Sequence, residues 1–78
     1  MVRVTRHVLD ARGLLCPMPV IRTQQTVESL QNGDELEVLC TDPGALQDIP
    51  AWCRVHGHVF VGAYEGEDEL RLQLTVCR

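Results

Sequence analysis

The residues best suited to chemistry lie together in the segment Leu14-Leu15-Cys16-Pro17-Met18-Pro19. Apolar or neutral residues recur after it at three- and four-residue steps, which predicts a helix over 17–31. Cys16 then occupies the N-cap, Pro17 the first helical position and Pro19 a position near N3. Two prolines remove two N–H groups and fix two φ angles, so the pattern predicts a rigid, exposed helix tip that presents a thiol.

The chemistry expected of Cys16 is that of a nucleophile. The positive end of a helix dipole favours thiolate over thiol, and Arg12 and Arg22 can add to that field. Because the prolines leave fewer N–H groups to solvate an anion, we expect only a modest lowering of the Cys16 pKa. Spacing alone leaves open the alternative that this cysteine has no chemical role and that the prolines only start the helix.

The other three cysteines give weaker signals. Cys40 and Cys53 fall on the apolar faces of predicted elements, which is typical of inert buried thiols, whereas Cys77 faces outward at the end of a strand. No two cysteines have the C-x-x-C spacing, and the histidines do not follow a zinc-finger pattern. The sequence therefore predicts neither a metal site nor a bound cofactor.

Several other polar and aromatic residues have ordinary structural explanations. We expect His58 to be exposed to solvent and Trp52 to be a core or interface residue. Asp42 and Asp48 each precede a predicted helical segment, and both are interpreted as helix caps. No carboxylate pair, Ser-His-Asp set or Gly-rich phosphate loop is visible, so hydrolytic and phosphoryl-transfer chemistry is not indicated.

The elements that must position these residues follow from periodicity and from glycine and proline positions. Gly33 is expected just after the first helix with a positive φ, and Pro50 is expected to kink any helix that begins at residue 43. The predicted elements are strands 3–10, 35–41, 58–64 and 69–77, a turn or short helical piece from 43, helices 17–31 and 48–56, and a hairpin at 65–68. The order β-α-β-α-β-β predicts an α+β fold, a two-layer α/β sandwich in which two helices cover one face of a four-stranded mixed sheet.

Length and composition limit the function further. The chain has 78 residues, which predicts one domain over 1–78 with a surface site and no deep cavity. All seven basic residues are arginine and the net charge is −4, which disfavours direct binding of nucleic acid. No long apolar run or secretory signal is visible, so we expect no membrane association and a cytoplasmic location.

With these residues in view, the chain resembles the TusA/SirA family of small sulfur-carrier proteins. The matching blocks are residues 9–20, which contain the C-P-x-P motif, and residues 32–36, 41–44 and 48–53. The resemblance implies a persulfide carried on Cys16, with Arg12, Gly13, Pro17 and Pro19 as the supporting motif. It also implies a sulfur donor protein, either a cysteine desulfurase or a rhodanese-like protein, and a sulfur acceptor protein. The pathways implied are tRNA thiolation, cofactor sulfur supply and sulfur oxidation.

Two other classes of function stay open at this point. In the first, the protein is a thiol redox module in which Cys16 pairs with Cys53 or Cys77 and no sulfur is transferred. The absence of C-x-x-C spacing makes this class weaker. In the second, the protein is an interaction module that binds protein or RNA through its sheet face without using the thiol.

Overall fold

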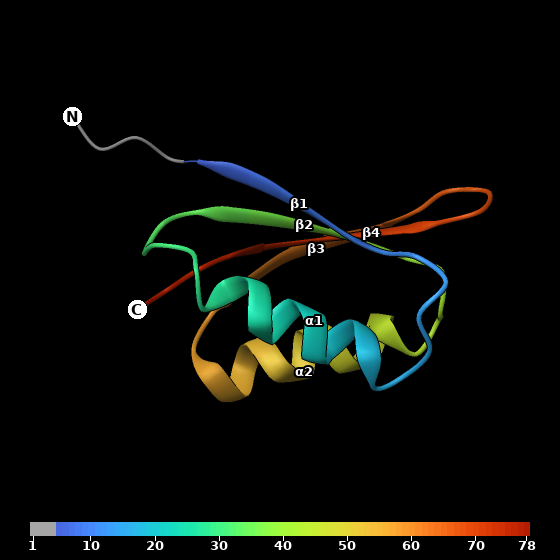
Figure 1. Cartoon of the computed structure of the whole chain (residues 1–78), viewed down its shortest axis with the longest axis horizontal. Helices are drawn as coiled ribbons and strands as arrows, with labels where there is room; N and C mark the ends of the chain where they lie inside the picture. The colour runs from blue at the N-terminus through green and yellow to red at the C-terminus, as the bar shows by residue number, and fades with distance from the viewer. Residues whose placement is uncertain (1–4) are drawn as a thin grey trace.

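The chain folds into a four-stranded sheet with both helices packed on the same face (Figure 1). The computed structural model describes residues 5–78. The elements are β1 (Arg6–Ala11), α1 (Met18–Val27), β2 (Glu35–Cys40), α2 (Ala45–His56), β3 (Val59–Glu65) and β4 (Leu70–Thr75). The strands lie in the order β1-β2-β4-β3, with β1 and β2 parallel and the other neighbours antiparallel. The predicted α+β sandwich and its element order are confirmed.

Alternating side chains determine which face of the sheet meets the helices. In β2, Leu36, Val38 and Cys40 are fully buried, as the alternation of the sequence predicts. Leu72 and Leu74 of β4 are buried opposite Val38 and Leu36, so the two central strands supply most of the sheet's contribution to the core. The intervening residues of these strands lie on the other face, which carries charged and polar groups.

Helix α1 is shorter than the predicted 17–31 because the chain tightens after Val27. The amide of Leu30 donates to the carbonyl of Val27, three residues back, and the guanidinium of Arg78 donates to the same carbonyl. Gly33 has the expected positive φ, 92°, but it lies in the turn that leads into β2 and not directly after the helix. The prediction of its conformation was right and the prediction of its position as a helix cap was wrong.

Helix α2 is longer than the predicted 48–56 and continues through Pro50. Pro50 removes one N–H from the helix, but Ile49 and Cys53 on the same element are fully buried against the sheet. Tertiary packing of this apolar face therefore outweighs the local cost of the proline. The helix ends as predicted at Gly57, which has φ 80°.

The remaining strand boundaries agree with the predictions to within a few residues. The predicted strand 3–10 is observed as β1 from Arg6, and residues 1–4 lie outside the described part of the chain. In β3 the pairing register with β4 shifts between Phe60 and Gly62. This bulge allows Phe60 to pack against the core while Tyr64 pairs opposite Arg71.

Candidate functional site

The candidate site is at the edge of the sheet where the parallel strands β1 and β2 both end. Each of these strands is followed by a loop and then by a helix, so α1 and α2 begin at the same end of the molecule (Figure 1). The two loops are tied together, because the Gly13 amide donates to Thr41 Oγ1 at 2.8 Å and the Cys16 amide donates to Asp42 Oδ2 at 2.7 Å. These bonds fix the segment that carries the thiol relative to the start of α2.

Cys16 is exposed and lies one residue before the N-cap of α1, which is Pro17. The predicted placement of the cysteine at the N-cap was therefore wrong by one residue. Its Sγ lies 2.9 Å from Asp48 Oδ2 on α2, in a geometry in which the thiol donates to the carboxylate. The hydrogen bond to Asp48, partial desolvation and the negative charges of Asp48 and Asp42 raise the pKa of Cys16. The predicted lowering of this pKa was wrong, because the nearest charges are carboxylates.

Asp42 holds the loop before α2 with both of its carboxylate oxygens. Oδ2 accepts the Cys16 amide, and Oδ1 accepts the Gly44 amide at 3.1 Å. These two backbone hydrogen bonds lower the pKa of Asp42. The prediction that both aspartates cap helices was wrong, because the N-cap of α2 is Gly44 and no side chain caps the helix. Asp42 holds the turn that precedes α2, whereas Asp48 lies within the helix and contacts the thiol.

Arg12 does not supply the positive field that the sequence suggested for Cys16. Its guanidinium contacts Asp10 at 2.9 and 3.0 Å and Glu69 at 3.3 Å. The pairing lowers the pKa of Asp10 to about 2 and raises the pKa of Arg12. Arg12 therefore links the end of β1 to the start of β4, and its charge is balanced by these two acids.

The two prolines of the motif differ in their surroundings. Pro17 is exposed at the N-cap, whereas Pro19, the second residue of α1, is fully buried. The carbonyl of Pro19 accepts the hydroxyl of buried Thr23 at 2.8 Å. Gly13 adopts φ 80°, a left-handed conformation that places its amide toward Thr41. Pro19 and Gly13 thus shape the loop and the helix start, and Pro17 remains at the surface beside the thiol.

The structure does not bring the other cysteines to Cys16. Cys40 and Cys53 are fully buried, and burial raises the pKa of each thiol to about 11. Cys77 lies beyond the end of β4, at the end of the sheet opposite to the loop that carries Cys16. All four cysteines are free, so the redox alternative gains no geometric support.

His58 is half-buried, not exposed as predicted, and lies far from the thiol at the start of β3. Its Nδ1 accepts the Cys77 amide at 3.0 Å, and its ring stacks on Trp52 with a centroid distance of 5.0 Å. Burial, followed by the charges of His56 and Arg78, lowers the pKa of His58. These contacts give His58 a structural role in joining α2 to the sheet.

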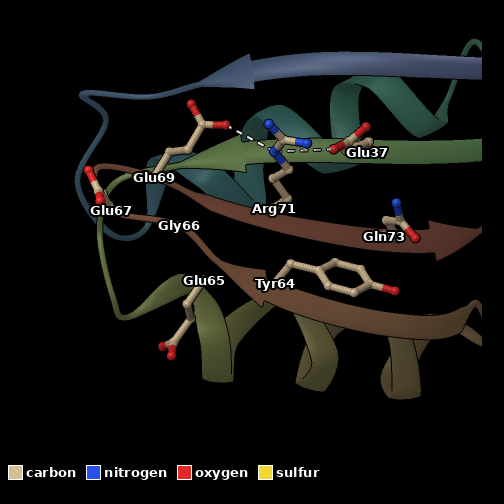
Figure 2. Close-up of a pocket in the computed structure, with 8 residues that line it drawn as sticks. All are labelled: Glu37, Tyr64, Glu65, Gly66, Glu67, Glu69, Arg71 and Gln73. Carbon is tan, nitrogen blue, oxygen red and sulfur yellow. Dashed lines mark hydrogen bonds and ion pairs between the residues drawn. The ribbon is translucent and has the colours of Figure 1, made fainter.

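Two pockets lie on the open face of the sheet, and neither is lined by Cys16. Figure 2 shows the larger one, of about 540 Å³, where Arg71 lies between Glu69 at 3.1 Å and Glu37 at 3.9 Å, with Tyr64 on the neighbouring strand. The smaller pocket, of about 270 Å³, adjoins it along β1 and β2. Because the arginine is already paired, the larger pocket offers no free cation to an anionic ligand.

Two exposed apolar side chains lie close to Cys16 in the sequence. Leu15, its neighbour, is 74% exposed, and Ile21, whose amide donates to the carbonyl of Pro17, is 39% exposed. Within residues 5–78 no group of three or more metal-ligating side chains is found. No helix of the described chain is long and apolar enough to cross a membrane. The site is therefore an open thiol with a partly apolar rim and two carboxylates behind it.

A two-layer α+β domain with an exposed cysteine just before a helix has the architecture of a small carrier protein. The chain belongs to the sulfurtransferase TusA family, whose model matches residues 7–76. A SirA-like protein from Desulfitobacterium hafniense has the same fold, with a TM-score of 0.78 at 22% identity, covering 91% of this chain and 97% of that protein. The family expected from the sequence is confirmed.

Several bacterial relatives are named as candidate sulfur carriers. The chain is 51% identical over 51 residues to YrkI of Bacillus subtilis, a match that covers 65% of this chain and 68% of YrkI. It is 47% identical over 59 residues to a Neisseria meningitidis protein, covering 76% of this chain and 80% of that one. YrkF of Bacillus subtilis is 43% identical over 63 residues, or 81% of this chain, which spans only 34% of YrkF. These names support a sulfur-carrier role in general.

Proposed function

We propose that this protein carries sulfane sulfur as a persulfide on Cys16 and passes it to an acceptor protein. The observation that carries the proposal is the exposure of the Cys16 thiol on a loop held by two interloop hydrogen bonds. A carrier must present its sulfur inside the sites of two other proteins, so an exposed nucleophile on a fixed loop suits this task. The family membership and the names of the relatives support the same role.

The proposed transfer needs only the thiol and two partners. In loading, the Cys16 thiolate attacks the outer sulfur of the donor's persulfide, a new S–S bond forms, and the donor cysteine leaves as a thiolate. The thiol proton passes to solvent or to the departing thiolate. In delivery, an acceptor thiolate attacks the outer sulfur on Cys16, takes it as a persulfide and releases the Cys16 thiolate. No external oxidant or reductant is required.

The partners in this proposal are a sulfur donor protein, of the cysteine desulfurase or rhodanese-like class, and a sulfur acceptor protein. The exposed side chains of Leu15 and Ile21 provide an apolar rim that such partners can cover. tRNA thiolation, cofactor sulfur supply and sulfur oxidation are the candidate pathways, and the chain itself contacts no nucleic acid in this scheme. Four free cysteines agree with the reducing cytoplasm as the proposed location.

Intact-mass measurement after incubation with inorganic polysulfide tests the proposal. We expect the wild-type protein to gain sulfur and to lose it again when cyanide is added, because cyanide takes the outer sulfur as thiocyanate. Cys16→Ser should not be loaded, whereas the matched control Cys77→Ser should behave like the wild type. Equal loading of Cys16→Ser, or no loading of the wild type, would contradict the proposal.

A further inference from the structure

The hydrogen bond between Cys16 and Asp48 is not needed to expose or to orient the loop, which Asp42 and Thr41 already hold. The distance of 2.9 Å between Sγ and Oδ2 directs the thiol hydrogen toward the carboxylate. An aspartate carboxylate is a far weaker base than a thiolate, so it accepts this hydrogen bond without removing the proton. The contact therefore stabilises the thiol and opposes the thiolate that the transfer reaction needs.

The two charged groups that shift the pKa of Cys16 act in the same direction. Asp48 faces it from α2 and Asp42 from the loop before α2, and both raise its pKa. On the β1 side, Arg12 is paired with Asp10 and Glu69. Arg22 of α1 makes no ion pair or side-chain hydrogen bond within residues 5–78. The groups that shift the pKa of Cys16 are thus the two carboxylates, and Arg12 and Arg22 are not among them.

We propose that Asp48 is a positioning residue that holds Cys16 in a protonated resting state until a cationic group of the docking partner pairs with its carboxylate. The inference rests on the proposed carrier function. Pairing of Asp48 with an arginine or lysine of the partner breaks the S–H···O contact and neutralises the adjacent charge. The proton then leaves to solvent and the thiolate forms only inside the complex. The partner surface implied is an apolar recess for Leu15 with a cation beside it.

This arrangement protects the free carrier. A thiolate that is exposed at all times reacts with any electrophile or disulfide it meets, whereas a thiol held by a carboxylate reacts slowly. Coupling the formation of the nucleophile to a partner's cation restricts reaction to proteins that carry that cation. Asp48 thus contributes to selection of the partner as well as to control of the reactivity of Cys16.

The first experiment measures the alkylation rate of Cys16 by iodoacetamide against pH, in a Cys77→Ser background where Cys16 is the only thiol that is not fully buried. We expect Asp48→Asn to move the midpoint to lower pH and to raise the rate at neutral pH several-fold. Asp68→Asn, which removes the same charge from the exposed hairpin, is the matched control and should leave the profile unchanged. An unmoved midpoint in Asp48→Asn would overturn the proposal, and Asp48→Ala provides the same test if the first variant does not fold.

The second experiment measures the preference of Cys16 for a cationic reagent. Cystamine carries two ammonium groups and dithiodiglycolate two carboxylates, and both react by thiolate attack on the disulfide with loss of one half as a thiolate. We expect the ratio of the cystamine rate to the dithiodiglycolate rate to be highest in the wild type, to fall in Asp48→Asn, and to be retained in Asp68→Asn. A ratio that does not depend on Asp48 would show that a cation does not act through this carboxylate.

These measurements involve no sulfur transfer, so the two proposals can fail separately. If the pH midpoint moves but polysulfide does not load Cys16, the carrier function fails while the contact between Asp48 and the thiol stands. If loading depends on Cys16 but Asp48→Asn changes neither the midpoint nor the reagent preference, the carrier function stands and the role of Asp48 is refuted.

Discussion

Replacing Pro19 by alanine removes two ring methylenes from a fully buried position in the second residue of α1. Their burial is worth about 0.8 kcal/mol each, or about 1.6 kcal/mol together. The alanine variant also gives the unfolded chain more freedom, which costs a further 0.4–1 kcal/mol or so. The restored N–H has no helical partner, because amides in the first turn have none, and its burial without a partner adds to the loss. The expected loss is therefore at least about 2 kcal/mol of unfolding free energy.

Urea unfolding followed by the fluorescence of Trp52, the single tryptophan, measures this loss. Pro43→Ala is the matched control, because Pro43 is exposed in the loop before α2 and should lose only the chain-entropy term of roughly 0.4–1 kcal/mol. If Pro19→Ala costs no more than Pro43→Ala, then packing is not the task of this proline and the reasoning is refuted.

Two further outcomes can be measured with the same unfolding assay. Gly33→Ala should lower the unfolding free energy by about 1 kcal/mol through backbone strain, because φ is 92° and nothing lies within 4 Å of the added Cβ. Gly44→Ala is the control, because φ at Gly44 is −58°, and it should lower the unfolding free energy by less. Equal losses in the two variants would argue against strain at Gly33. The pKa of His58 is lowered from 6.5 in the folded protein, so the unfolded chain binds a proton at this residue more readily. Neutral His58 therefore contributes its full stability above pH 6.5. That contribution is lost as the pH falls from 6.5 through the lowered pKa of the folded protein. His58→Asn keeps an acceptor for the Cys77 amide but does not titrate. The difference in unfolding free energy between wild type and this variant should therefore become smaller from pH 7.5 to pH 5. A difference that stays constant over this range would contradict the account.

The sheet was predictable because its central strands alternate strictly. Leu36, Val38 and Cys40 in β2, with Leu72 and Leu74 in β4, mark the buried face in the sequence, and the structure buries each of them. Helix ends were less predictable, because distant contacts decide them. The carbonyl at the end of α1 binds Arg78, more than fifty residues away, and no local pattern reports such a contact.

The position of the thiol was predicted closely but its electrostatics were not. Local reasoning weighed the helix dipole and Arg12, while the dominant group, Asp48, is 32 residues away in sequence. A topological signal was available: parallel β1 and β2 end at one edge, so the segments after them must meet. That argument brings Asp42 and Asp48 toward Cys16, and it turns an expected lowering of the pKa into a rise.

The place of β4 in the sheet has a consequence for the order of assembly. β4 is the last element along the chain, yet it lies in the interior of the sheet, hydrogen-bonded to β2 on one side and β3 on the other. During synthesis, β1 and β2 can pair early, with α1 connecting them. One edge of β2 then stays open, and β3 has no partner strand until β4 has been synthesised. Until β4 is in place, the sheet lacks its link between β2 and β3. The core can therefore be completed only when Leu72 and Leu74 are added to it.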